Sequence, residues 1–427
     1  MTARPLPLVV KLVTRLGERA FAAILVVVSL VIPRSKRIWA FGSWYGQRFA
    51  DNPKYFFLHC ASREHERVQA VWLSMSSTVV RRIRALGFPA YHRLSPSGLW
   101  YALRAGVYIF DCRVMDVSSV ASSGALKVNL WHGVPLKMIE RDIAQSNNAL
   151  AQANHGSPLV RAANKVLRPQ LSERYDYILG TSQATCERFA GAFGVATSQV
   201  IRGGYPRTDV LLSGDDHARF RMPEEERVIE QCRAYRHDGT RVMLYMPTFR
   251  DWRNDADRVI PIDWRALDAL LLAEGGAVFC KLHPNDQARL PDLAGLSRVH
   301  LIPSSVDPYP ILPHTDALIS DYSSIFFDYL LLDRPLVFYP YDLDDYRTYS
   351  RALYDDYDTV TPGPKAYDAA GLQRVLTDLL SSYDEHARRH AAERAAVRSR
   401  FYEHVDDGAS ARLFDALRTR TAARGRA

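Results

Sequence analysis

The feature that most constrains the fold is the pattern of the stretch Asp316–Tyr346. It begins with a short apolar run, Ala317–Ile319, which predicts a buried strand, and continues into a polar turn over 320–324. Ile325–Leu332 is apolar on nearly every side, as is typical of a buried helix, and Leu336–Tyr339 predicts a second strand. This order is a βαβ unit, whose turn opens at the carboxyl end of a parallel sheet. Ligands of α/β proteins bind at that edge.

The same alternation of strands and helices repeats from about residue 37 onward, which predicts doubly wound parallel sheets. A chain of 427 residues has room for two such domains. We expect a Rossmann-like first domain over 37–215 and a second over 225–417, with linker candidates at 213–216 and 223–227.

Two stretches have weaker patterns. Residues 142–170 are polar and poorly patterned, which favours a mobile loop or a helical insertion. The tail over 368–417 predicts charged helices, and the residues from 418 to the end predict disorder.

The first 36 residues are predicted to contact a membrane. Leu8–Arg19 has apolar and charged faces at helical spacing, and Ala20–Pro33 is almost wholly apolar but short of the roughly 20 residues that span a bilayer. Basic residues flank the apolar run on both sides, so a helix lying on the anionic inner leaflet fits best. Packing of this helix on the first domain, or a true span or signal anchor, remain the alternatives.

Charge and cysteine content narrow the class of protein. The formal net charge of +8 favours anionic partners, such as phosphates, nucleic acid or an acidic membrane surface. The five cysteines are isolated and odd in number, which fits reduced thiols and argues against a zinc site or a disulfide framework.

Four polar turns each follow an apolar strand and precede a helix: His132-Gly133, Thr248–Arg250, His283-Pro284 and Asp321–Ser324. Because the carboxyl ends of parallel strands meet at the ligand-binding edge, we expect these turns to converge. The first turn lies in the first predicted domain and the others in the second. The sequence therefore predicts a site in a cleft between the two domains.

His132 is the candidate base of the first turn, since a neutral imidazole can take a proton from a hydroxyl. The alternative is a histidine that only caps the following turn. Lys137 and Arg141 follow at helical spacing, so both face either a phosphate or solvent.

Cations of the second domain suit a phosphate. Lys281 and His283 are two apart and would share one face of a strand beside Pro284, which suits a phosphate clamp. Arg250, after Thr248, offers a planar fork. The alternatives are a satisfied strand-end histidine and a salt bridge from the arginine to Asp251 or Asp255.

Ser323 and Ser324 begin the buried helix of the opening stretch, where free N–H groups and hydroxyls can bind an anion or form a plain cap. Asp328 lies in an otherwise apolar helix, so it either holds a ribose or is a hydrogen-bonded structural carboxylate. We expect no metal site and no cofactor, because the sequence has no Walker A motif and its isolated cysteines form no metal-ligand motif.

With these turns identified, the chain resembles the CDP-glycerol glycerophosphotransferase family, which primes and polymerises teichoic acids and related capsule polymers. The resemblance covers about residues 37–365. The motifs are F-G-S-W-Y-G at Phe41–Gly46, D-N-P at Asp51–Pro53, N-L-W-H-G-V-P-L-K at Asn129–Lys137, G-Y-P-R-T-D at Gly204–Asp209, M-P-T-F-R at Met246–Arg250, K-L-H-P-N at Lys281–Asn285, S-D-Y-S-S-I-F-F-D-Y at Ser320–Tyr329, P-Y-D-L-D-D-Y at Pro340–Tyr346 and P-G-P at Pro362–Pro364.

The resemblance implies a GT-B fold and attack of an acceptor hydroxyl on the β-phosphorus of CDP-glycerol, with release of CMP. It implies that His132 is the catalytic base, that His283, Ser323 and Ser324 hold the donor diphosphate, and that the protein works on a lipid- or polymer-linked acceptor at the cytoplasmic face of the membrane. We expect His132 and His283 to be catalytic. The residues expected to bind substrate are Gly133, Lys137, Arg141, Arg207, Thr248, Arg250, Lys281, Pro284, Asp321, Ser323, Ser324 and Asp328.

Other function classes fit less well. A CDP-ribitol-dependent transferase, or a GT-B glycosyltransferase using a nucleotide sugar, would use a similar inventory of residues. A basic protein that only binds membranes or nucleic acid would leave the four polar turns unexplained, so we expect no nucleic-acid partner.

Overall fold

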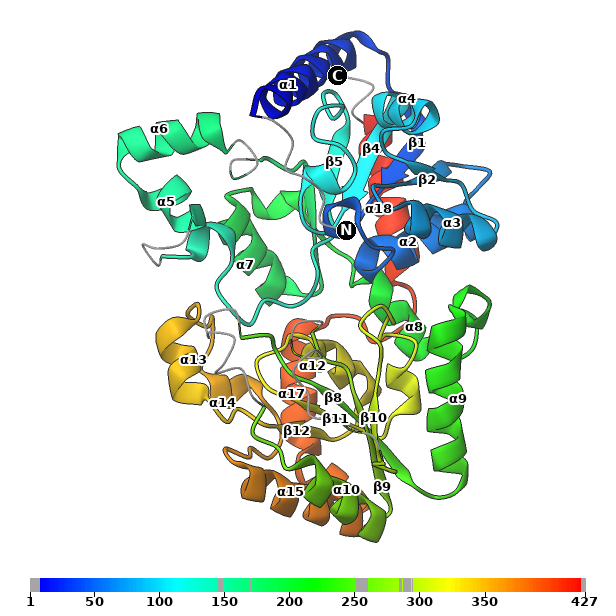
Figure 1. Cartoon of the computed structure of the whole chain (residues 1–427), viewed down its shortest axis with the longest axis vertical. Coiled ribbons are helices and arrows are strands. Elements are labelled where there is room, and N and C mark those ends of the chain that lie inside the picture. The colour runs from blue at the N-terminus through cyan, green and yellow to red at the C-terminus, as the bar shows by residue number, and fades with distance from the viewer. Residues whose placement is uncertain are drawn as a thin grey trace. The chain divides into compact units, whose positions relative to one another are not determined.

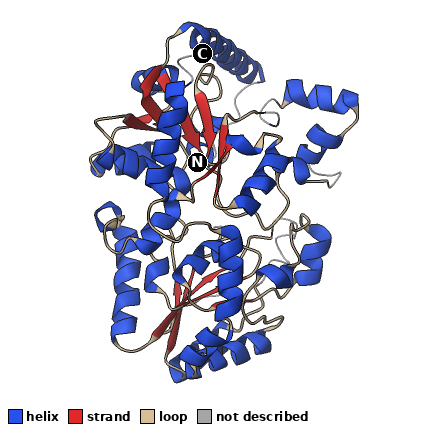
Figure 2. Cartoon of the chain, turned by 180° about the vertical axis from the view of Figure 1, so that it is seen from behind, coloured by secondary structure: helices blue, strands red, loops and turns tan. Residues whose placement is uncertain are grey.

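The computed structural model describes residues 8–144, 149–168, 171, 173–250, 260–283, 286, 293 and 295–423 (Figure 1). Contacts within the chain divide it into two compact units. The first comprises Met1–His132, Ser172–Leu179 and Ser410–Ala427, and the second comprises Gly133–Leu171 and Gly180–Ala409. The predicted domain ranges, 37–215 and 225–417, remain predictions. Helices flank the strands of both sheets (Figure 2).

The larger sheet has seven strands in the order β3-β2-β1-β4-β5-β6-β7, and the pairs from β3 to β6 are parallel. Its strands are β1 Ser35–Phe41, β2 Gln69–Ser74, β3 Ala90–His92, β4 Ala105–Phe110, β5 Leu126–Asn129, β6 Tyr177–Gly180 and β7 Val200–Arg202. The strand order reverses between β1 and β4. A reversal of this kind opens a ligand-binding crevice at the carboxyl ends of the two strands.

The smaller sheet has five parallel strands in the order β10-β9-β8-β11-β12, with its reversal between β8 and β11. Its strands are β8 Arg241–Met246, β9 Gly276–Cys280, β10 Val299–Leu301, β11 Ala317–Ser320 and β12 Leu336–Phe338. The two parallel sheets confirm the predicted doubly wound α/β class.

The α-helices surround these sheets. They are α1 Leu8–Val31, α2 Asp51–Arg63, α3 Ser77–Ala85, α4 Pro96–Arg104, α5 Ala149–His155, α6 Pro158–Leu167, α7 Gln183–Phe193, α8 Asp209–Leu212, α9 Pro223–His237, α10 Trp264–Ala273, α12 Ile325–Tyr329, α13 Leu343–Tyr349, α14 Tyr357–Val360, α15 Ala369–Ser381, α16 Tyr383–Arg389, α17 Ala391–Phe401 and α18 Ala409–Ala423. The helices α5 and α6 show that the stretch 142–170 contains a helical insertion.

Each unit has its own apolar core. In the first, Phe57 of α2 packs edge-on against Phe41 of β1 and Trp72 of β2, with ring centroids 5.4 and 5.5 Å apart. In the second, apolar side chains of β8, β9, β11 and β12 pack with Leu271 of α10 and Leu376 of α15. These apolar contacts hold the carboxyl ends of the strands in fixed positions.

The buried helix expected over 325–332 is confirmed, as the short α-helix α12 followed directly by a 3-10 turn at Leu330–Leu332. The disorder expected from residue 418 is wrong for the described residues, because α18 continues to Ala423. Leu417 is fully buried, and Phe414 packs on Trp39 of β1 at 5.4 Å, so tertiary packing stabilises this helix.

The N-terminal residues form one helix, α1. Leu25 and Ser29 are buried, whereas Phe21, Ile24 and Val27 are exposed. None of the helices in the described part of the chain is both long enough and apolar enough to cross a membrane.

Candidate functional site

His132 lies just beyond the end of β5, beside the carboxyl end of β4. Its Nδ1 is 3.2 Å from the backbone carbonyl oxygen of Asp111, the residue that follows β4. A carbonyl oxygen can only accept a hydrogen bond, so Nδ1 carries the proton and Nε2 carries the lone pair of the neutral ring. This tautomer suits a group that takes a proton from a hydroxyl.

Aromatic side chains surround this imidazole. The indole of Trp131 stacks on it with ring centroids 4.2 Å apart, and that of Trp44 lies at 6.3 Å. Trp131 has a left-handed backbone, with φ of +52°, and the side-chain amide of Asn52 donates to its carbonyl oxygen at 2.9 Å. We did not predict these neighbours. The tryptophans in the motifs N-L-W-H-G and F-G-S-W-Y-G were the available signal.

Gly133 belongs to the second unit, where it contacts Ser324 and Arg207. Its φ is +141°, and a Cβ atom there would lie 2.7 Å from Ser324 Oγ and 3.0 Å from Arg207 Nη2. Only glycine allows this close approach. Ser324 occupies the N-cap position of α12, but its side chain makes no capping hydrogen bond. The Ser324 side chain therefore does not form the plain helix cap that was its alternative role.

Arg207 and Asp328 form a buried pair. Arg207 Nη2 lies 2.6 Å from Asp328 Oδ2, and the hydroxyl of Tyr309 donates to the same oxygen at 2.5 Å. The hydroxyl of Tyr402 donates to the other carboxylate oxygen. Asp328 is 0% exposed and makes the hydrogen bonds expected of a structural carboxylate, while its binding of a ribose stays a prediction. Its effect is to hold the guanidinium of Arg207 beside Gly133 and Ser324.

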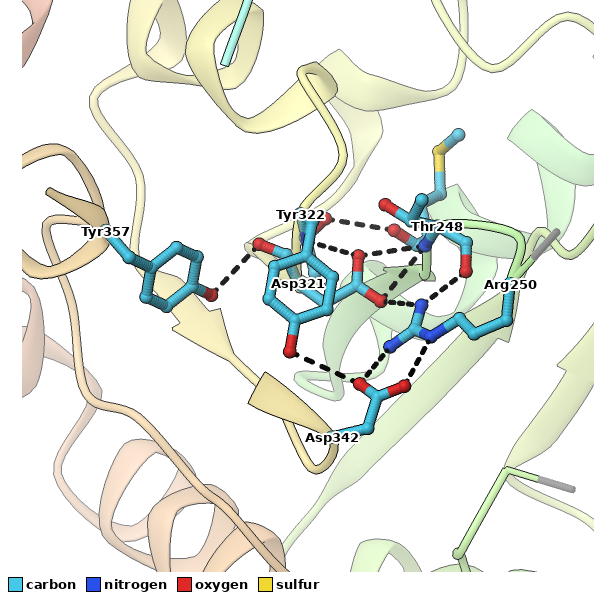
Figure 3. Close-up of polar contacts among 8 residues, drawn as sticks. Thr248, Arg250, Asp321, Tyr322, Asp342 and Tyr357 are labelled. Carbon is cyan, nitrogen blue, oxygen red and sulfur yellow. Dashed lines mark hydrogen bonds and ion pairs between the residues drawn. The ribbon is translucent and has the colours of Figure 1, made fainter. Parts of the chain in front are cut away.

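Arg250 lies in a second buried network, at the reversal point of the smaller sheet (Figure 3). Its Nε and Nη2 donate to Asp342 at 2.9 and 2.8 Å, and its Nη1 donates to Asp321 and to the carbonyl oxygen of Thr248. The backbone N–H of Thr248 also donates to Asp321, at 2.8 Å, and the hydroxyl of Tyr322 donates to Asp342 at 3.2 Å. The guanidinium is thus inside the protein, with most of its donors engaged.

The guanidinium of Arg250 keeps its positive charge inside the protein. Burial lowers the pKa of Arg250, but the neighbouring carboxylates of Asp321 and Asp342 outweigh burial and raise this pKa well above its usual value. The charged guanidinium therefore joins the turn after β8 to the turn after β11. Asp342 was not predicted as a site residue, although it lies in the motif P-Y-D-L-D-D-Y.

Lys137 and Arg141 are not on one helical face, so the helical spacing expected for them is wrong. The backbone of Lys137 forms an isolated antiparallel β-bridge with that of Leu353. The ammonium of Lys137 lies over the ring of Tyr346, 4.8 Å from the centroid. Arg141 lies in a short 3-10 turn, and its guanidinium occupies the space next to Gly194, at the end of α7. Strand-like pairing with residues 352–354 replaces the helix.

The remaining predicted residues lie at the carboxyl end of β9 and before α12. Lys281 donates to the carbonyl oxygen of Pro303 at 3.0 Å, and His283 is exposed with its ring stacked on Phe249 at 4.2 Å. Both lie past the end of β9, so their predicted alternation along one strand is wrong. Ser323 is half-buried, and Pro284 lies outside the described residues.

Among the described residues, the potential ligand atoms of Asp111, Cys112 and Asp116 lie within 4.8 Å of one another. The carboxylate oxygens already accept hydrogen bonds. Asp111 accepts from the hydroxyl of Ser43 at 2.7 Å, and Asp116 accepts from the backbone N–H of Tyr45 at 2.7 Å and from that of Cys112 at 2.8 Å. These acids thus organise the surrounding backbone.

Comparison with known proteins identifies the family. A Staphylococcus aureus (strain NCTC 8325) teichoic acid glycerol-phosphate transferase is 26% identical over 392 residues, which cover 89% of this chain and 92% of that protein. The ribitol-phosphate polymerase TarL of the same strain is 31% identical over 212 residues, which cover 48% of this chain and 35% of that protein.

The fold has a close counterpart among solved structures. The structure of the wall teichoic acid polymerase TagF superposes with a TM-score of 0.75 at 22% identity, and the match covers 97% of each chain. This likeness, together with the two parallel sheets, confirms the predicted GT-B fold. The model of the family described as CDP-glycerol:poly(glycerophosphate) glycerophosphotransferase matches residues 24–419. The chain therefore belongs to the CDP-glycerol:poly(glycerophosphate) glycerophosphotransferase family.

Proposed function

We propose that this chain transfers glycerol phosphate from CDP-glycerol to a hydroxyl group of a polymer- or primer-bound acceptor and releases CMP. The acceptor oxygen bonds to the β-phosphorus, the bond from that phosphorus to the oxygen of CMP breaks, and the hydroxyl proton passes to Nε2 of His132. The observation that carries this proposal is the hydrogen bond between His132 Nδ1 and the Asp111 carbonyl, which leaves Nε2 basic. Family membership supports the donor class.

The donor diphosphate is assigned to the cluster that begins at the next residue of the chain. Gly133 brings its backbone against the hydroxyl of Ser324 and the guanidinium of Arg207. A guanidinium and a hydroxyl beside a bare backbone suit phosphate oxygens, whose charge grows on the leaving CMP. We retain His283 as a further donor ligand because its ring is exposed beyond β9.

Arg250 and Asp321 are proposed to act on the donor site indirectly. Their side chains bind each other, so they fix the turns after β8 and β11. The Nε, Nη1 and Nη2 atoms of Arg250 all donate to the carboxylates of Asp321 and Asp342, so a phosphate would have to displace one of these two to bind this guanidinium.

A donor panel tests the proposed function. Purified protein is incubated with a glycerol-phosphate-primed acceptor and with CDP-glycerol, CDP-ribitol or a UDP-sugar, and the released nucleotide is measured. We expect CMP release with CDP-glycerol and dependence of that release on acceptor. Turnover of the UDP-sugar without CMP release from either CDP-polyol would overturn the proposal. Preference for CDP-ribitol would reassign the polyol, an outcome to which the TarL likeness lends weight.

The protein is proposed to work at the cytoplasmic face of the membrane, bound through α1. Phe21, Ile24 and Val27 of this helix are 48%, 60% and 62% exposed, and Leu30 is 70% exposed, while Leu25 on the other side is buried. An apolar stripe of this kind is suited to the interface between lipid headgroups and acyl chains.

The basic residues that follow α1 divide into two groups. Arg34 donates to the backbone carbonyl oxygens of Ala102 and Ala121 at 2.7 and 2.5 Å, so it anchors the end of the helix to the first unit. Lys36 and Arg37 are exposed. These two are the cations that we assign to anionic lipid headgroups.

Vesicle sedimentation tests this assignment. The double variant Ile24→Asp/Val27→Asp should lose binding to vesicles that contain phosphatidylglycerol, while turnover of a soluble acceptor is retained. Leu272→Asp is the matched control, since Leu272 is 56% exposed on α10 of the other unit. Unchanged vesicle binding of the double variant would contradict the role of α1.

A further inference from the structure

The loop that follows β1 has a backbone that residues with side chains rarely adopt. Trp44 and Tyr45 have φ angles of +47° and +57°, both in the left-handed region. Such residues persist only where the surrounding structure holds them, and they gather at functional sites.

Two buried acids hold the loop in this conformation. Asp111 and Asp116 are both 0% exposed. Asp111 accepts from the hydroxyl of Ser43 at 2.7 Å and from the N–H of Trp44 at 3.1 Å, and Asp116 accepts from the N–H of Tyr45 at 2.7 Å. Burial raises the pKa of Asp111, and the neighbouring Asp116 raises it further. The fold thus places two acids in an unfavourable environment, where their bonds fix the geometry of one loop.

The loop presents its aromatic side chains outward. Trp44 is 36% exposed and Tyr45 is 51% exposed, so core packing does not explain why large side chains occupy strained positions. The guanidinium of Arg48, itself exposed, lies over the indole of Trp44, 4.9 Å from the ring centroid. The same indole is 6.3 Å from the imidazole of His132.

We propose that Trp44 and Arg48 form the subsite for the end of the acceptor, and that they recognise a polyol phosphate. Arg48 binds the phosphodiester, and the indole packs against the carbon skeleton of the terminal polyol, which brings its hydroxyl to His132. A guanidinium that stacks on an indole uses its flat face and keeps its in-plane N–H groups for a phosphate. This inference rests on the proposed function, because it takes His132 as the base.

Acceptor kinetics test the subsite. KM is measured at saturating CDP-glycerol for two acceptors. One is a short glycerol-phosphate oligomer, and the other is a glycerol ether of the same length without phosphates. We expect Arg48→Gln to raise KM for the oligomer at least ten-fold, while KM for the ether and for CDP-glycerol stays within two-fold. Arg81→Gln, at an exposed arginine on α3, is the matched control and should change none of these values.

A second variant separates binding from folding. Trp44→Gly relieves the left-handed strain, so its Tm should be unchanged or higher, while KM for both acceptors rises at least ten-fold. A lower Tm together with a normal KM would show that the indole is structural and would overturn the inference. So would an oligomer KM for Arg48→Gln that stays within two-fold of the unsubstituted protein.

Failure of the proposed function would be recognised separately. If the unsubstituted protein releases no CMP from CDP-glycerol, the transfer reaction is wrong. Calorimetric binding of the oligomer in the absence of donor then still tests the subsite. Binding that weakens at least ten-fold in Arg48→Gln supports the subsite, and binding that is equal in both proteins overturns it.

Discussion

The buried network around Arg250 gives a prediction whose magnitude follows from the structure. Arg250 is 4% exposed, and it lies between Asp321 and Asp342, whose side chains are each 1% exposed. Arg250→Met removes the cation and leaves two buried carboxylates facing each other. Breaking a buried ion pair by removal of one partner costs about 3–5 kcal/mol. We therefore expect the second unit to lose at least ~3 kcal/mol of stability.

Asp342→Asn should be milder. It keeps the pair between Arg250 and Asp321 and weakens only the charged hydrogen bonds to residue 342, at a cost of about 1.5–3 kcal/mol. The matched control is Arg236→Met. Arg236 is 39% exposed and lies 3.4 Å from the buried Asp316. Asp316 keeps the N–H of Val242 and the guanidinium of Arg241 as partners, so this half-exposed pair should contribute at most ~1 kcal/mol.

Hydrogen exchange of peptides that cover β8 and β11 is the assay, because the network joins the ends of these two strands. Since ~1.4 kcal/mol is a factor of ten, a loss of ~3 kcal/mol means exchange more than about a hundred-fold faster. The reasoning is refuted if Arg250→Met exchanges within about ten-fold of the unsubstituted protein. It is also refuted if Arg236→Met accelerates exchange as much as Arg250→Met does.

Three further perturbations test other parts of the account. Gly133→Ala should raise KM for CDP-glycerol at least ten-fold in steady-state assays, because the new Cβ atom would lie 2.7 and 3.0 Å from its neighbours. Gly239→Ala is the control and should leave this KM unchanged, since Gly239 has a φ of +78° but no atom within 4 Å of the new Cβ. Asp328→Asn should lower kcat/KM about ten- to a hundred-fold by weakening the charged bond that orients Arg207; an unchanged value would count against this positioning role. Burial, with nearby arginines, lowers the pKa of His314 from an ordinary 6.5 to about 4, so the unfolded chain binds the extra proton between these pH values. Stability in urea should therefore be greatest above pH 6.5 and fall toward pH 4, and His314→Gln should flatten that fall.

Local patterns predicted the elements well. Apolar runs identified the strands β5, β8 and β11, and the polar turns at His132, Thr248 and Asp321 do follow the carboxyl ends of these parallel strands. Such runs report burial and short-range periodicity, which sequence carries directly.

Contacts between residues that are distant in the chain could not be predicted from local patterns. Arg207 pairs with Asp328, 121 residues away, and Arg250 pairs with Asp342, 92 residues away. Residue type alone does not reveal which carboxylate the fold brings near either arginine. The order of α18 was missed for the same reason, since it depends on packing against Trp39.

Release of CMP by the His132→Ala variant is the most direct test of the central claim. With CDP-glycerol and a glycerol-phosphate-primed acceptor, this variant should release CMP about a hundred- to ten-thousand-fold more slowly than the unsubstituted protein, as expected when a general base is removed. Calorimetric affinity for CDP-glycerol should stay within about three-fold, because the base acts on the acceptor hydroxyl. CMP release at an undiminished rate would contradict the account.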